Sequence, residues 1–160
     1  MLKNEWKKEI FKEDLNKVIL MGLLMALLGG IIAAIIEYVF SLIHINVSIG
    51  IIICAILIGT MVKKSYVNYH ILYPMLSIMF LILAAIISRL VYPFVFYFNF
   101  DSYFSYLSSG TNWLYIIFGP FYNLSKYDSP NYAYIIVSVV IHLMCYFVCY
   151  KLAKGRNWFF

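Results

Sequence analysis

The chain has 160 residues, of which 64% are hydrophobic and only 12% are charged, and its formal net charge is +5. Soluble domains carry roughly 25% charged residues, so a water-soluble domain of this length could not bury so much apolar surface. The basic residues lie beside apolar runs and form no single stripe, which argues against nucleic-acid binding. We therefore expect an all-α integral membrane protein with one transmembrane domain over residues 1–160.

Residues 1–17 carry five lysines and four acids, with apolar residues recurring at helical spacing. This pattern predicts an amphipathic helix that lies along the membrane surface, with its lysines toward anionic lipid. A helix that docks on a cytoplasmic partner would have the same pattern. The first seventeen residues carry no cleavable signal pattern, so we expect the next segment to stay as an anchor.

Residues 18–40 form a long apolar run, about 33 Å at helical rise, which is enough to cross a hydrocarbon core of roughly 30 Å. Four small residues fall at every fourth position in this run, and on a helix they share one face. We call them the small-residue strip: Gly22, Ala26, Gly30 and Ala34. Small side chains let a neighbouring helix approach closely, so we expect this strip to be a packing surface.

Two more apolar runs follow, at residues 47–62 and 70–91. The first is short, and Ala55 and Gly59 offer small-residue contacts to the preceding helix, which predicts a tight antiparallel hairpin. The second is followed by Pro93, where we expect the helix to stop, because proline removes a backbone hydrogen bond.

Residues 93–131 are rich in Phe, Tyr, Ser and Asn. Their glycines and capping residues predict two short helices, one from Asp101 or Ser102 to a stop at Gly110 and one from Thr111 or Asn112 to Gly119. Aromatic residues with polar tips are typical of membrane interfaces, so we expect a cap over one mouth of the bundle. Residues 132–152 form the fourth predicted span.

Basic residues predict the orientation. Ten of the twelve flank one side of the predicted spans, in the N-terminal segment, at Lys63 and Lys64 and in the C-terminal tail. Loops rich in lysine and arginine stay cytoplasmic, so both termini are expected inside a cell membrane and the cap outside. The abundance of Ile, Lys, Asn and Tyr is typical of an AT-rich bacterial genome.

Two charged residues fall within the predicted spans. Helical rise places Glu37 about 28 Å along the first span and Arg89 a similar distance along the third, both near the outer membrane edge. One hypothesis is a Glu37–Arg89 ion pair under the cap, which would be structural or would grip a headgroup or an ion. The alternative is that each side chain reaches the outer headgroups separately.

His142 lies midway along the fourth span. A neutral histidine that is hydrogen-bonded to Ser138 or to another helix is the simpler interpretation, and a proton relay is the alternative. Cys145 and Cys149 share a helix face and could hold a metal or a lipid, but we interpret them as small buried residues. The sequence points to no metal and no cofactor.

The sequence contains no HExxH, phosphate-cradling glycine loop or Gly-x-Ser-x-Gly pattern, which disfavours an enzyme. Our leading expectation is a non-catalytic membrane subunit of accessory, scaffold or immunity type. It would act through helix packing with copies of itself or with another membrane protein in the lipid bilayer. One alternative is a homo-oligomeric channel or small transporter with a polar path near Glu37, Arg89 and His142, and another is a lipid-acting membrane enzyme.

Overall fold

The computed structural model describes residues 9–43, 49–123 and 132–155. Within these ranges all the regular structure is helical, which confirms the all-α prediction. The helices are α2 (Lys12–Leu42), α3 (Ile49–Ser65), α4 (Leu72–Tyr97), α5 (Phe100–Ser108), α6 (Gly110–Phe118), α7 (Pro120–Asn123) and α8 (Tyr132–Lys154).

Three of these helices are long and apolar enough to cross a membrane, where the sequence had predicted four. They are α2, α4 and the Ile135–Lys154 part of α8. The predicted second span corresponds to α3, which has 17 residues. At helical rise α3 is about 26 Å long, shorter than the roughly 30 Å of a hydrocarbon core.

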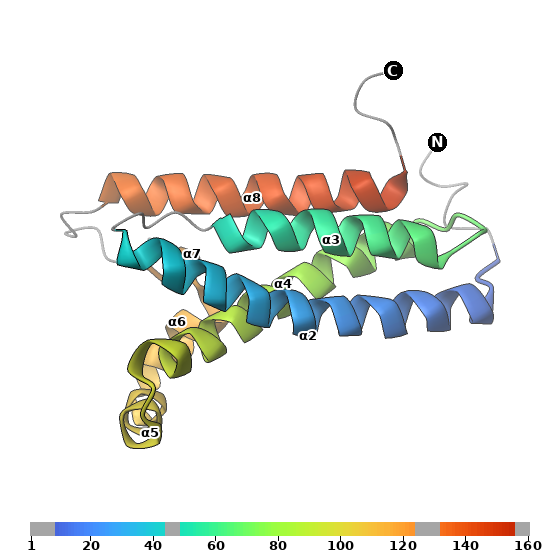
Figure 1. Cartoon of the computed structure of the whole chain (residues 1–160). Helices are drawn as coiled ribbons and strands as arrows, with labels where there is room; N and C mark the ends of the chain where they lie inside the picture. Colours follow the sequence, from blue (N-terminus) through green and yellow to red (C-terminus); the bar gives the residue numbers. More distant parts are fainter. Residues whose placement is uncertain (1–8, 44–48, 124–131, 156–160) are drawn as a thin grey trace.

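The long helices form one bundle, with α8 and α3 side by side above α2 and α4 crossing behind them (Figure 1). The first turn of α2 and the last turns of α3 and α8 meet at one end. The six lysines of the described residues all lie there: Lys12, Lys17, Lys63, Lys64, Lys151 and Lys154. We call it the basic end. At the opposite end α5 and α6 project sideways from the bundle, and we call these two helices the arm.

The start of α2 differs from the prediction of a separate amphipathic helix over residues 1–17. Residues 9–11 are not helical, and one helix runs without a break from Lys12 to Leu42. No glycine or proline lies near residue 17 to end the helix, so the polar first turns and the apolar span form a single element. Residues 1–8, and with them the first half of the predicted amphipathic segment, lie outside the described residues.

Helix α4 also continues past its predicted stop, since Pro93 lies inside the helix, which ends at Tyr97. The proline removes one hydrogen bond, the one that the Arg89 carbonyl would accept, and the remaining bonds keep the helix intact. Phe98 then ends the helix with a left-handed backbone, at φ 47°. The Asn99 side chain caps α5 by accepting from the Asp101 amide, and Gly110, predicted as a stop, is the first residue of α6.

The small-residue strip of α2 packs against α4. All four of its residues are buried. A Cβ atom added at Gly22 would overlap the Phe80 ring, and one added at Gly30 would lie 2.8 Å from the Ala84 carbonyl oxygen. The strip therefore lets the Phe80 ring lie on the α2 backbone at Gly22 and the two backbones meet at Gly30, and it faces the inside of this chain.

Helix α3 packs on α2, α4 and α8. At its start a Cβ atom on Gly50 would lie 2.8 Å from Cα of Ala33 in α2, as the predicted hairpin requires. Near its end Gly59 instead faces α8, where an added Cβ atom would lie 2.9 Å from the Cys149 carbonyl oxygen. Ala55 is buried between these two contacts. The two glycines of α3 thus join it to two different neighbours.

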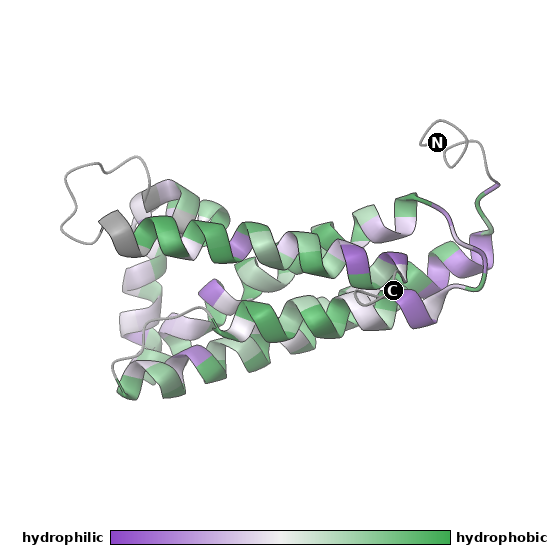
Figure 2. Ribbon diagram, turned by 90° about the horizontal axis from the view of Figure 1, so that it is seen from above, coloured by the Kyte–Doolittle hydropathy of each residue, from purple (hydrophilic) through white to green (hydrophobic). Residues whose placement is uncertain are grey.

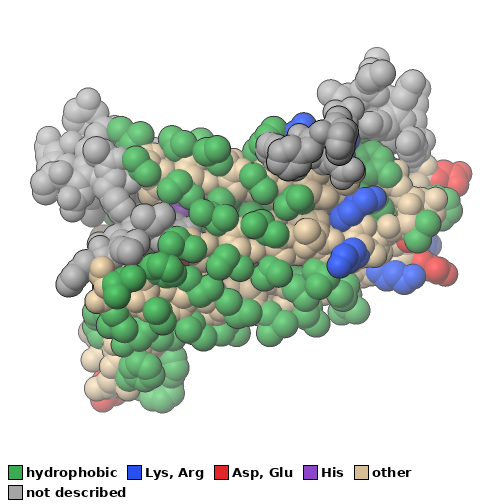
Figure 3. All heavy atoms as spheres, turned by 45° about the horizontal axis from the view of Figure 1, so that its top comes forward, with side chains coloured by type: hydrophobic (Ala, Val, Ile, Leu, Met, Phe, Trp, Pro, Cys, Tyr) green, Lys and Arg blue, Asp and Glu red, His purple; other side chains and the backbone are tan. Residues whose placement is uncertain are grey.

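The outside of the bundle is apolar. Hydrophobic ribbon dominates the middle of the helices, and hydrophilic residues are more frequent at the basic end (Figure 2). Hydrophobic side chains are spread along the described part of the visible face in the space-filling view, with the blue lysine side chains toward one end (Figure 3). Leu20, Leu27 and Met144, for example, are 66%, 54% and 62% exposed. Such a surface is suited to lipid or to other apolar helices.

A methyl group added on the strip should loosen the bundle. In Gly30→Ala the new Cβ atom would lie 2.7 Å from Ile87 Cγ2 and 2.8 Å from a backbone oxygen, so α4 must move away. We expect a loss of about 1–3 kcal/mol, measured as a lower melting temperature of the detergent-purified chain.

The matched control is Gly110→Ala, because a Cβ atom at Gly110 meets nothing within 4 Å. This variant should melt at or slightly above the temperature of the wild type. Equal melting temperatures for Gly30→Ala and the wild type would contradict the close approach of α2 and α4.

Candidate functional site

Polar side chains from three long helices meet inside the bundle, near the end that carries the arm. We call them the polar cluster: Glu37 of α2, Ser88 and Arg89 of α4, and His142 of α8. Ser88 and His142 are each 4% exposed, and Glu37 and Arg89 are partly buried. The cluster brings together the three polar span residues that the sequence singled out.

Arg89 is the centre of this cluster. One terminal guanidinium nitrogen donates to the Ile116 carbonyl of α6 at 3.2 Å, and the other lies 3.2 Å from His142 Nε2. The guanidinium therefore connects α4 to α6 and to α8. The Ile116 carbonyl lies in the last turn of α6, where the helix dipole leaves partial negative charge that attracts a cation. Arg89 thus fixes the base of the arm to the bundle.

The hydrogen bonds of His142 determine its tautomer. Its Nδ1 lies 2.8 Å from the Ser138 carbonyl oxygen, which can only accept, so Nδ1 carries the proton. Nε2 is then an unprotonated acceptor for the Arg89 guanidinium, which can only donate. The ring also makes an edge contact with Phe121, with centroids 6.4 Å apart. Of the two interpretations drawn from the sequence, this geometry matches the hydrogen-bonded neutral histidine.

Gly119 makes room for the guanidinium. It ends α6 with φ +56°, and a Cβ atom at this position would overlap the terminal atoms of Arg89. Any other residue would carry both the strain of a left-handed backbone and a clash with the charge. The absence of a side chain at residue 119 therefore lets the turn after α6 lie directly on Arg89.

Glu37 takes part through Ser88. The Ser88 hydroxyl donates to the Glu37 carboxylate at 3.4 Å, and Glu37 and Arg89 attract each other electrostatically. The two side chains nevertheless form no direct ion pair in the part of the chain that the structure describes. In place of the expected Glu37–Arg89 ion pair the structure has a network. The two opposite charges lie near each other, but Glu37 accepts its hydrogen bond from Ser88, and Arg89 makes its hydrogen bonds to Ile116 and His142.

The remaining sequence candidates lie elsewhere. Cys145 and Cys149 are buried, and the Cys149 thiol points to the Ser77 carbonyl at 3.5 Å. Residues 9–43, 49–123 and 132–155 contain no group of three potential metal ligands. Sequence reasoning missed Ile116 and Gly119 as partners of Arg89. A backbone carbonyl leaves no signal in a sequence, and Gly119 was noted only as the end of a helix.

The arrangement in the cluster favours holding helices together over catalysis. Arg89 and His142 engage each other and backbone carbonyls, and Glu37 engages Ser88. No family model, curated protein or solved structure matches this chain.

Loss of the guanidinium should release the arm. In Arg89→Gln the side chain is too short to reach both Ile116 and His142, and hydrogen bonds of charged groups are worth about 1.5–3 kcal/mol each. We expect the α6 amides to exchange with deuterium at least tenfold faster than in the wild type. Lys64→Gln, which removes an exposed charge at the far end, should leave α6 exchange unchanged.

A charge swap tests the network against a simple ion pair. In the double variant Glu37→Arg/Arg89→Glu a simple pair would be restored. In the observed network, by contrast, the glutamate at residue 89 would face the Ile116 carbonyl, which has no proton to donate. We expect the double variant to melt at least as low as Arg89→Gln, and recovery of the wild-type melting temperature would contradict the network.

Proposed function

We propose that this protein crosses the cell membrane four times, with both termini in the cytoplasm and the arm outside. The grouping of the described lysines at one end supports this orientation, because positively charged segments stay cytoplasmic. Helix α3 would serve as the fourth span despite its length, because it packs against α2, α4 and α8 and exposes only one apolar face, with Ile52 and Ile56 40% and 47% exposed. Its ends need not reach lipid headgroups by themselves.

Within that membrane placement, we propose a non-catalytic subunit that acts by packing against a second copy or another membrane protein. The observation that carries this proposal is how the polar and small residues are used. The small-residue strip packs inside the chain, and the Arg89 guanidinium is bound to other helices of the same chain. The surface left for other molecules is the exposed apolar face of α2 and α8.

One observation favours the second candidate, a channel or small transporter: Glu37, Arg89 and His142 come together from three helices. A continuous path needs polar groups along the rest of the bundle as well. Between the cluster and the basic end the core is instead filled by large apolar side chains, such as Ile58, Val62 and Leu81, each 0% exposed. A path through a single chain is therefore less well supported than a packing role.

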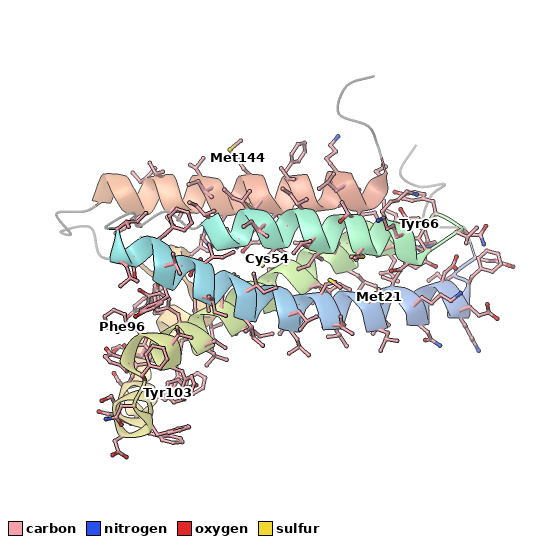
Figure 4. All side chains as sticks on the ribbon, viewed as in Figure 1. Met21, Cys54, Tyr66, Phe96, Tyr103 and Met144 are labelled. Carbon is pink, nitrogen blue, oxygen red and sulfur yellow. The ribbon has the colours of Figure 1, made fainter. Side chains whose placement is uncertain are left out.

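Cross-linking in native membranes tests the packing role. Single cysteines at exposed positions on α2 (Leu27→Cys) and α8 (Met144→Cys) should give a cross-linked species of fixed stoichiometry on at least one face. Met144 points away from the bundle in Figure 4. The control is the wild-type chain, whose own cysteines Cys54, Cys145 and Cys149 are buried and should give none.

The same preparations separate the candidate functions. A monomer that is never cross-linked, in mild detergent or in membranes, would overturn the packing proposal. Ion flux in liposomes that disappears with Arg89→Gln would replace it with the channel, and turnover of a lipid by the pure chain would replace it with an enzyme.

A further inference from the structure

The arm leaves the bundle sideways, at the end opposite the basic end (Figure 1). Its helices α5 and α6 have nine residues each, so neither is long enough to cross a membrane. In the proposed membrane placement the long helices run across the bilayer, and an element that projects sideways from their outer end runs along the bilayer surface. The arm then lies beside the bundle, and its own side chains decide what it can bind there.

Helix α5 has one aromatic face and one polar face. At the helical period four residues share the aromatic face: Phe100, Tyr103, Phe104 and Leu107. The opposite side carries a carboxylate and two hydroxyl groups, from Asp101, Ser102 and Ser105. The Phe100 and Phe104 side chains are 65% and 63% exposed, so the rest of the chain leaves much of the aromatic face uncovered. A short helix with these two faces is suited to the boundary between water and lipid.

The aromatic face of α5 is turned back toward the bundle. The centroid of the Phe94 ring of α4 lies 5.2 Å from that of Phe100 and 5.6 Å from that of Tyr103. Tyr103, which also contacts the Phe104 ring, lies on the side of the arm that is turned toward the bundle (Figure 4). The polar face of α5 therefore points away from the bundle. In the proposed placement the aromatic face meets lipid, and the polar face meets the water outside.

Helix α6 is joined to α5 by two hydrogen bonds. The Asn112 side-chain amide donates to the Tyr106 carbonyl at 2.7 Å, and the Trp113 indole donates to the Leu107 carbonyl at 2.7 Å. Both acceptors lie in the last turn of α5, where helix carbonyls have no partner in their own helix. The exposed apolar side chains of α6 are Trp113, Leu114, Ile117 and Phe118. The arm is thus one unit with exposed apolar surface on both of its helices.

The charge of the arm indicates which property of a lipid surface it would recognise. Helices α5 and α6 contain no lysine or arginine, and Asp101 is their only carboxylate. The arm therefore has no basic group that would attract anionic headgroups. Binding would depend on the burial of apolar surface, and on phenol groups such as that of Tyr103, whose ring can lie in lipid while its hydroxyl reaches water. Such binding is independent of headgroup charge.

We propose that the arm binds the outer surface of the bilayer beside the bundle, with the aromatic face of α5 in the headgroup region and Asp101 and Ser105 in water. The arm lies on lipid in this arrangement and leaves the mouth of the bundle uncovered. The hydrogen bond from Arg89 to the Ile116 carbonyl links the arm to α4, so the bound arm holds the outer end of the bundle at a fixed depth. This inference rests on the proposed membrane placement and is independent of whether the chain packs with a partner.

Spin labels at two adjacent residues of α5 test the proposal, in the full chain reconstituted at low density in phosphatidylcholine liposomes. Phe104→Cys and Ser105→Cys are both exposed positions, on opposite faces of the helix. Paramagnetic relaxation measures how well oxygen, which dissolves in lipid, and a water-soluble nickel complex reach each label. We expect oxygen to relax the label at 104 at least threefold more than nickel does, and the reverse at 105. Phosphatidylglycerol in the liposomes should change neither ratio.

The wild-type chain is the labelling control, because its own cysteines are buried and should take up no label. Nickel that reaches the label at 104 as well as the one at 105 would overturn the proposal. Exclusion of both reagents at 104 would overturn it too, because protein would then cover the aromatic face. A label at Leu27→Cys in α2 separates the two levels of the argument: nickel that reaches it overturns the membrane placement itself. Nickel excluded at 27 but not at 104 overturns the arm proposal alone.

Discussion

The close approach of α2 to α4 at Gly22 and Gly30 is the constraint on which the rest of the structure depends. Here the helices meet with no side chain of α2 between their backbones. Glu37, two turns after Gly30, is thereby brought within reach of Ser88 on the facing helix. Larger residues in the strip would separate the helices and move the carboxylate away from the polar cluster.

Polar groups in apolar surroundings need hydrogen-bond partners, and this need determines how the arm is attached to the bundle. A guanidinium away from water needs acceptors, and Arg89 finds one in the α6 backbone and one in His142. The histidine is held in the accepting tautomer by its own helix. Helix α5 of the arm packs on α4 through the rings of Phe94, Phe100 and Tyr103, and α6 is joined to the bundle by the Arg89 guanidinium. The residues that the sequence suggested as a possible polar path instead connect helices to one another.

The two ends of the bundle differ in chemistry for a related reason. At the arm end, charges of opposite sign lie near each other, so they need no external partner. At the basic end, the Asp14 carboxylate accepts hydrogen bonds from the Val67 and Asn68 amides, and the Lys63 and Lys154 ammonium groups lie over tyrosine rings.

The sequence by itself determined the helical class, the positions of the apolar segments along the chain and the spacing of Gly22, Ala26, Gly30 and Ala34 on one helix face, because these depend on hydropathy and on the 3.6-residue period. Only the tertiary structure decided that α2 continues from Lys12, that Pro93 lies within α4 and that Gly59 faces α8. It also decided that Arg89 binds a carbonyl and a histidine in place of Glu37. Those outcomes depend on which groups meet across helices and on backbone atoms that every residue shares, and local sequence patterns carry no information on either.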